Sequence, residues 1–318
     1  MSLSGFLPLR PLGRAVRPLI GAVAAALLAS CGGGTSQIEA FVADRLVVFG
    51  DETSALTPDG RSYGVNAIAD GVLDCEAQPI WVQSLAAIYG LTFAECNPDD
   101  VTSPQAFMRA VAGARVTDVT AQVDAQLTGD GVAGNTLVTM LAGTNDVLDL
   151  YAAFPDTTRA ELLTQARARG AQLAVEVNRL VAAGARVIVS TAPDVGLTPY
   201  ALAEKAAHTD TDRAALLTAL TSEFNAGLRT TVLNDGRYIG LVLADEMVQA
   251  MTISPSSFGL GNIKDAACAV ALPDCTTETL VTGADAATWL WADDLRLAFN
   301  GQNRLGILAV SRARNNPF

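Results

Sequence analysis

Short apolar runs alternate with long helical segments along most of this 318-residue chain, and this alternation restricts the folds open to it. The apolar runs have the length and composition of buried strands, and they cover residues 45–49, 136–141, 186–190 and 238–243. Amphipathic helical spacing is found over residues 80–89, 116–127, 158–183, 211–233 and 301–314. Strands that alternate with helices predict an α/β domain in which a parallel sheet lies between helix layers.

The longest helix has clear end signals. Thr158 and Glu161 form a capping box at its start, and Gly184 follows its last turn, where a left-handed residue commonly ends a helix. No internal repeat or long linker interrupts the chain after residue 40, so we expect one domain over residues 44–318. A hydrophobic content of 50% with 17% charged residues is typical of a globular protein with a substantial core.

Polar segments follow three of the expected strands directly. They are Gly50–Glu52, Gly143–Asp146 and Ala192–Asp194, which we interpret as turns. In an open parallel sheet, ligands bind beside the carboxyl ends of the strands. The sequence therefore predicts that these segments share one edge of the sheet and form its functional site.

Five sequence blocks resemble the SGNH, or GDSL, hydrolase family, in the branch of bacterial phospholipases, lecithinases and haemolysins. The ordered blocks are Phe49–Glu52, Ala110–Ala114, Gly143–Asp146 (Gly-Thr-Asn-Asp), Thr191–Pro199 and Asp293–Arg296. The resemblance covers roughly residues 44–312. It implies a three-layer α/β/α sandwich with a parallel sheet, of the flavodoxin-like kind, and acyl-ester hydrolysis.

The family mechanism uses a serine nucleophile, a histidine base and an aspartate that orients the histidine. Backbone N–H groups and an asparagine side chain hold the oxyanion. The resemblance assigns oxyanion donors to Gly113 and Asn145, with the backbone N–H of Glu52 as a third. It assigns the orienting carboxylate to Asp293.

The reacting pair departs from the family pattern. Glu52 stands where the resemblance places the serine, and Arg296 stands where it places the histidine. Glutamate has no hydroxyl to attack an ester, and a guanidinium stays protonated and cannot act as a base. We therefore expect an ester-hydrolase scaffold that has lost serine-esterase activity and binds an acylated lipid, an ester or a glycan. Glu52 and Arg296 should form a salt bridge, with Asp293 at the other edge of the guanidinium.

The sequence leaves room for an active ester hydrolase with an unconventional nucleophile. Ser54 or Thr53 could be a displaced nucleophile, although both residue types are common in turns. Glu52 could act as a base or nucleophile beside a second carboxyl, but Arg296 would suppress its basicity and would also disfavour a metal site. His208 lies in a polar segment far from every block, and we interpret it as an exposed loop residue. Candidates for the second carboxyl are Asp51, Asp146, Asp293 and Asp294.

The N-terminus has the order of a bacterial lipoprotein signal. Arginines 10, 14 and 17 precede an apolar run over residues 19–28, and Leu28-Ala29-Ser30-Cys31 resembles a lipobox. We expect a signal peptide at residues 1–30, acylation of Cys31 and a flexible tether over residues 31–43. Gly32 favours the outer membrane of a Gram-negative cell. The alternative is an ordinary signal peptide that contains a cysteine.

Charge and cysteine content restrict the classes of molecule that the chain could bind. The chain has 21 basic and 33 acidic residues, and three of the basic ones lie in the first 30 residues, so the remainder has 18 basic residues and a net charge of −15. Such a chain disfavours nucleic acid. Cys75 with Cys96, and Cys268 with Cys275, form two local groups that an exported protein would pair as disulfides, with buried free thiols as the alternative. One histidine and no Cys-x-x-Cys motif give no sign of a metal or cofactor site.

Overall fold

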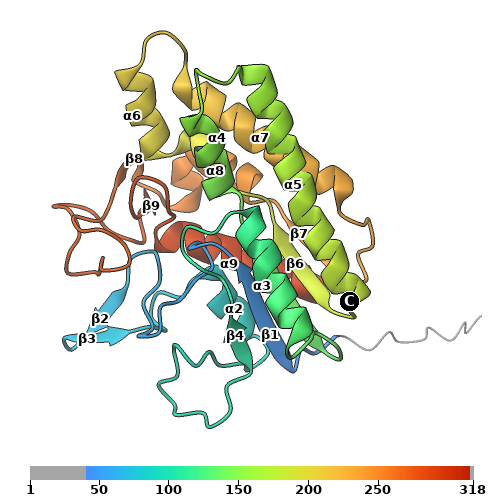
Figure 1. Ribbon diagram of the computed structural model, residues 1–318. Helices are drawn as coiled ribbons and strands as arrows, with labels where there is room; N and C mark the ends of the chain where they lie inside the picture. Colours follow the sequence, from blue (N-terminus) through green and yellow to red (C-terminus); the bar gives the residue numbers. More distant parts are fainter. Residues whose placement is uncertain (1–40, 316–318) are drawn as a thin grey trace, which may run out of the picture. The chain divides into compact units, whose positions relative to one another are not determined.

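The apolar runs of the sequence form the strands of a parallel sheet. The computed structural model describes residues 41–315, and Figure 1 shows the sheet at the centre of this part of the chain. The sheet has the order β4-β1-β5-β6-β7. Counted along the chain, this is the order 2-1-3-4-5 of flavodoxin-like folds, so the predicted fold class is confirmed. The strands are β1 (Arg45–Gly50), β4 (Ala106–Met108), β5 (Thr136–Leu141), β6 (Arg186–Ser190) and β7 (Ile239–Val242).

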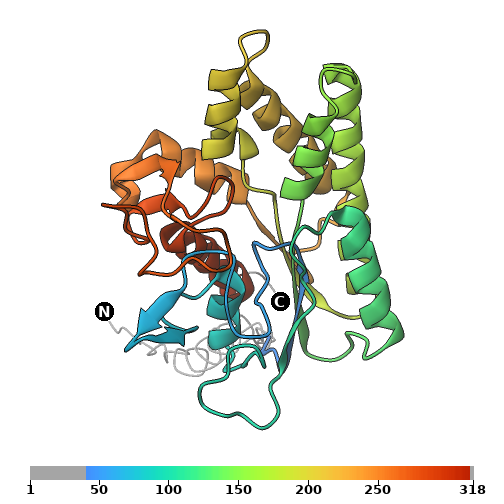
Figure 2. The same cartoon turned by 60° about the vertical axis from the view of Figure 1, so that its left-hand side comes forward.

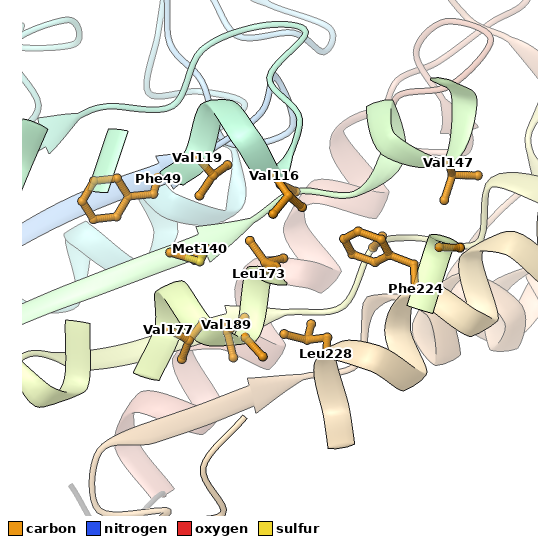
Figure 3. Packing of buried hydrophobic residues seen from close by; sticks show 14 of the residues in the cluster. Phe49, Val116, Val119, Met140, Val147, Leu173, Val177, Val189, Phe224 and Leu228 are labelled. Carbon is orange, nitrogen blue, oxygen red and sulfur yellow. The ribbon is translucent and has the colours of Figure 1, made fainter. Parts of the chain in front are cut away.

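Helices cover both faces of the sheet, which gives three layers (Figure 2). Successive side chains of a strand point to opposite faces, so Leu46 and Val48 of β1 pack against one helix layer and Val47 and Phe49 against the other. Figure 3 shows part of the second core, in which Phe49 lies among helix residues. The first layer contains α2 (Trp81–Ala87), α8 (Ala244–Ile253) and α9 (Phe299–Asn315). The second contains α3 (Val116–Thr128), α5 (Arg159–Ala182) and α7 (Arg213–Thr231).

The remaining elements are short, and the sequence indicated neither these nor β4 and α8. One of them corrects an expectation, because the segment Gly143–Asp146 is not a turn: helix α4 begins at Thr144. Asn145 and Asp146 therefore lie in the first turn of a helix. These elements are β2 (Ala67–Ala69), β3 (Val72–Asp74), α4 (Thr144–Ala152), η1 (Val195–Leu197), α6 (Pro199–Ala207), η2 (Pro255–Phe258), β8 (Asn262–Ala266) and β9 (Trp289–Trp291).

The end signals of the longest helix are confirmed. The Thr158 hydroxyl accepts a hydrogen bond from the backbone N–H of Glu161, and the Glu161 carboxylate accepts one from the backbone N–H of Thr158. Gly184 has a φ of +99°, the left-handed conformation expected after the last turn.

The packed part of the chain begins earlier than the sequence indicated. Phe41 and Ala43 were expected in the tether, but both are buried, and the Arg186 guanidinium stacks 4.3 Å from the Phe41 ring. The expected signal peptide and Cys31 lie outside the described residues. Over residues 41–315, no helix is both long enough and apolar enough to cross a membrane.

Candidate functional site

Strand β1 delivers Glu52 to the carboxyl edge of the sheet. Its last residue, Gly50, has a φ of +135°, and a Cβ there would stand 1.9 Å from the carbonyl oxygen of Leu141. Only glycine permits this close approach of β1 to β5. The chain then turns, with the backbone N–H of Ser54 donating to the carbonyl of Asp51, and the turn places Glu52 at the end of the strand.

Helix α4 brings Asn145 to the same edge. Gly143 precedes the helix with a φ of +131°, and a Cβ on it would lie 2.5 Å from the Phe224 ring. Glycine therefore lets β5 pass directly into the helix. The Asn145 side chain is held by a hydrogen bond of 3.2 Å from its Nδ2 to the carbonyl oxygen of Ala114, which ties α4 to the loop that contains Gly113.

The Glu52 carboxylate accepts hydrogen bonds from both expected oxyanion donors. The backbone N–H of Gly113 donates to Oε2 over 2.7 Å, and Asn145 Nδ2 donates to the same oxygen over 3.0 Å. The side chain of Glu52 is only 2% exposed. The carboxylate therefore fills the position in which these donors would hold an anion.

Arg296 completes the surroundings of this carboxylate. Its Nε donates to Glu52 Oε1 over 3.0 Å, and its Nη2 donates to the same oxygen. The predicted contact between Glu52 and Arg296 is thus confirmed, although the two residues are 244 positions apart. We call the Gly113 N–H, the Asn145 amide and the Arg296 guanidinium the anion cradle.

The electrostatics of the anion cradle keep Glu52 ionised. Burial alone would raise the pKa of Glu52, but the Arg296 charge and the Gly113 N–H outweigh burial and hold the pKa below its usual value. Burial would likewise lower the pKa of Arg296, and the charges of Glu52 and Asp293 more than offset it, so this pKa is raised. Both members of the pair are therefore charged at neutral pH.

Asp293 shapes the loop that presents Arg296. Its Oδ1 accepts the backbone N–H groups of Leu295 and Arg296, over 2.8 and 2.6 Å. Its Oδ2 is 3.8 Å from Arg296 Nη1, a longer contact than the sequence-based expectation of a second tight partner for the guanidinium. The main contribution of this carboxylate is to the turn.

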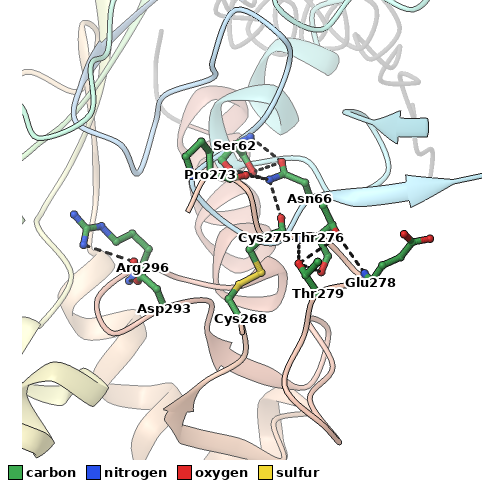
Figure 4. Close-up of a disulfide and its surroundings, with 10 residues drawn as sticks. All are labelled: Ser62, Asn66, Cys268, Pro273, Cys275, Thr276, Glu278, Thr279, Asp293 and Arg296. Carbon is green, nitrogen blue, oxygen red and sulfur yellow. Dashed lines mark hydrogen bonds and ion pairs between the residues drawn. A yellow bond between two sulfur atoms is a disulfide. The ribbon is translucent and has the colours of Figure 1, made fainter. Parts of the chain in front are cut away.

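A disulfide braces the same loop. Figure 4 shows the bond between Cys268 and Cys275 close to Arg296 and Asp293. The backbone N–H of Cys268 donates to the carbonyl of Ala292, whose own N–H donates to the carbonyl of Arg296. The second predicted disulfide joins Cys75 and Cys96, so the local pairing is confirmed.

Two buried carboxyl groups beside the site were not singled out for perturbed acidity. Burial, followed by the charge of Glu52, raises the pKa of Asp51 to about 8, and one of its oxygens has no hydrogen-bond partner among the described residues. Burial raises the pKa of Asp146 to about 6, although it accepts the backbone N–H of Val116 and lies 3.5 Å from Arg169. The sequence feature that could have identified both groups is their position shortly after strands β1 and β5.

The other sequence candidates lie outside the anion cradle. Ser54 is fully buried, and its hydroxyl oxygen accepts a hydrogen bond from Trp81 Nε1 over 3.1 Å. The backbone N–H of Thr53 donates to Asp51, as expected of a turn residue. His208 ends α6, with 43% of its side chain exposed, and lies 3.5 Å from Glu204. Within residues 41–315, no group of three or more metal-ligating side chains gathers.

Comparison with known proteins identifies a family. The model of the family described as GDSL-like Lipase/Acylhydrolase matches residues 47–277, a segment that contains Glu52, Gly113 and Asn145 and ends before Asp293. No curated protein matches the sequence.

Solved structures of low sequence identity are also similar to the chain. A lipolytic protein of the G-D-S-L family from Veillonella parvula is 10% identical, with a TM-score of 0.41 over 84% of this chain and 96% of that one. The acetylxylan esterase Axe2 from Geobacillus stearothermophilus is 14% identical, with a TM-score of 0.43 over 86% and 95%. LAE5, an α/β hydrolase from the metagenome of Lake Arreo in Spain, is 14% identical, with a TM-score of 0.42 over 86% and 96%.

Proposed function

The chain belongs to the GDSL-like lipase/acylhydrolase family, and from this premise we propose that it is a lipid-anchored envelope protein that has lost serine-esterase activity. The observation that carries the proposal is the position of the Glu52 carboxylate. It accepts hydrogen bonds from Gly113, Asn145 and Arg296, and so occupies the anion cradle with a group of the chain itself.

The residues present cannot run the acyl-transfer reaction of the family. The attacking group would have to be a hydroxyl at position 52, and the proton acceptor would have to be a neutral base at position 296. Glu52 offers a carboxylate that is already bound on both oxygens, and Arg296 offers a charged guanidinium. An ester carbonyl entering the site would therefore meet neither nucleophile nor base.

The carboxylate also removes the electrostatic contribution to catalysis. Oxyanion donors act by stabilising negative charge that develops on the substrate. In this chain the Gly113 N–H and the Asn145 amide already stabilise the negative charge of Glu52. A second anion at the same place would be repelled, so the retained donors would not supply the residual catalysis that an empty oxyanion site gives.

The remaining role that this scaffold supports is binding. The Arg296 side chain is 21% exposed, so the guanidinium presents a charged edge next to the closed site. An acylated lipid, an ester or an acylated glycan is the ligand class that a scaffold of this family would retain. Acylation of Cys31 and export to the outer membrane complete the proposal, which rests there on the order of basic residues, apolar run and lipobox.

Ester hydrolysis tests the loss of activity. We expect the full-length protein to show no turnover of p-nitrophenyl acetate or butyrate above the rate in buffer. The double substitution Glu52→Ser with Arg296→His should produce measurable hydrolysis, because it frees the Gly113 N–H and the Asn145 amide and restores the nucleophile and the base together. Each single substitution should remain inactive and serves as the matched control.

Turnover by the unsubstituted protein would contradict the proposal. If that turnover disappeared in Glu52→Ala or Ser54→Ala, the unconventional nucleophile would be identified at the same time.

A further inference from the structure

A groove of about 380 Å³ opens between α8 and α9, where strand β7 ends. Its volume lies within the range of small-molecule sites. Strand β7 is three strand positions from β1, so the groove lies roughly 14 Å across the sheet from the anion cradle, and it shares no lining residue with it. The groove is lined by Val242, Leu243, Met247, Phe258, Ile307 and Leu308, with Glu246, Arg304 and Arg312 as its charged members.

The middle of the groove is an uncovered apolar surface. Ile307 and Leu308 lie on α9 and are 51% and 37% exposed, whereas Val242 and Met247 beside them are only 1% and 7% exposed. Exposed aliphatic side chains that continue into a concave apolar wall have the form of a ligand-binding groove. A flat bilayer surface would not reach the recessed side chains, but a single hydrocarbon chain would.

Two guanidinium groups stand at the ends of this apolar stretch. Arg304 and Arg312 are eight residues apart on α9, which separates them by about 12 Å along the helix. Neither forms an ion pair with any residue from 41 to 315, although acidic residues outnumber basic ones in this chain. Glu246 at the rim is engaged by Arg229 over 3.3 Å. The groove therefore offers two guanidinium groups that no carboxylate of residues 41–315 pairs.

The two arginines differ in how they are held. The Arg304 guanidinium lies 5.5 Å from the centre of the Phe258 ring, which fixes it over one end of the groove. Arg312 has no comparable ring or ion-pair contact within the described part of the chain. Its guanidinium is free to make a bidentate contact with a carboxylate.

We propose that the groove between α8 and α9 binds a single-chain amphiphile with an anionic head group, of the fatty carboxylate class. The hydrocarbon chain lies against Met247, Ile307 and Leu308, and the carboxylate binds Arg312. This site is separate from the anion cradle, so the inference does not depend on the proposed loss of esterase activity.

Photolabelling of the full-length protein in a non-ionic detergent tests the site. The probe is decanoate that carries a diazirine in its chain, and peptide mass spectrometry locates the label. We expect labelled peptides from α8 and α9. Unlabelled decanoate should compete, whereas decanol should need at least about tenfold more, because it lacks the charge that Arg312 recognises.

A matched pair of arginine substitutions measures how much the Arg312 charge contributes to labelling. Arg312→Gln should lower labelling about tenfold, while Arg314→Gln, on the same helix but outside the lining, should leave it unchanged. Equal labelling of the two variants, or label concentrated around Glu52 and Asn145, would overturn the proposal. Binding to phosphatidylglycerol vesicles without labelling by the probe would overturn it as well, because α9 would then be a membrane-contact face.

Discussion

At the residue scale, the ion pair of Glu52 and Arg296 keeps the buried Glu52 carboxylate ionised in the anion cradle. Removal of one partner leaves the other as an uncompensated charge in a largely buried place, which typically costs more than the pair itself contributes. We expect Arg296→Ala to lower the free energy of unfolding by about 3–5 kcal/mol, measured by urea denaturation of the full-length protein. Glu52→Ala with Arg296→Ala should cost less than the sum of the single changes. Additive effects of the two changes would show that the contact is not energetically coupled.

Asp51 should make the stability of the protein depend on pH. Its pKa is raised to about 8, so the folded state holds a proton that the unfolded state releases above about pH 4. The contribution to stability is therefore full at low pH and falls as pH rises towards 8. Asp146, whose pKa is about 6, makes the free energy of unfolding fall with rising pH in the same way, but only up to about pH 6.

Between pH 6.5 and 8 the free energy of unfolding should fall with a slope of up to about 1.4 kcal/mol per pH unit. Asp51→Asn should flatten this slope, because its side-chain oxygen can still accept the Thr53 N–H but does not titrate. Asp146→Asn is the control and should retain the slope in this window. An unchanged slope in Asp51→Asn would show that another group is responsible.

The sequence indicated that Glu52 and Arg296 would meet, but not how the carboxylate would be held. The resemblance located the two positions, and opposite charges supplied the reason for contact. Glutamate, however, carries its oxygens two carbons further from the backbone than serine does. That added length brings the carboxylate to the Gly113 N–H and the Asn145 amide, and residue types alone did not reveal this.

At the element scale, the longest helices and strands were predicted, and most of the elements that were missed are short; α8, with ten residues, is the longest of these. The capping box fixed the start of α5 to within one residue, and the long apolar strands were placed correctly. Helix α4 was interpreted as a turn, because nine residues that begin with Gly-Thr-Asn-Asp carry stronger turn signals than helical periodicity. Strands of three residues, such as β4, show no recognisable alternation at all.

The loop between β9 and α9 depends on the disulfide of Cys268 and Cys275. That bond holds the backbone of Cys268, whose N–H donates to the carbonyl of Ala292, and the Ala292 N–H donates in turn to the carbonyl of Arg296. We expect replacement of both cysteines by serine to speed hydrogen exchange at the Ala292 amide by about tenfold, as local opening becomes easier by roughly 1.4 kcal/mol. The same replacement at Cys75 and Cys96 should leave this amide unchanged. Equal effects of the two replacements would contradict a local role.

At the scale of the whole molecule, we expect the N-terminus to determine where the protein is located. The order of basic region, apolar run and lipobox predicts acylation at Cys31, and a chain with a net charge of −15 after residue 30 would not be held at an anionic membrane by charge. We expect Cys31→Ala, or globomycin treatment, to remove the mature protein from the outer-membrane fraction. Ser30→Ala keeps a small residue before the cysteine and should fractionate normally. Normal fractionation of Cys31→Ala would contradict lipid anchoring.

The salt bridge in the anion cradle also bears on the history of the chain. Glu52→Ser alone would leave the guanidinium of Arg296 without its main partner. Arg296→His alone would leave the buried Glu52 carboxylate with a weaker cationic partner. Under the proposed loss of esterase activity, each single change towards a hydrolase is therefore expected to give a less stable protein that gains no activity. Selection against such intermediates would make this pair of residues easier to keep than to reverse.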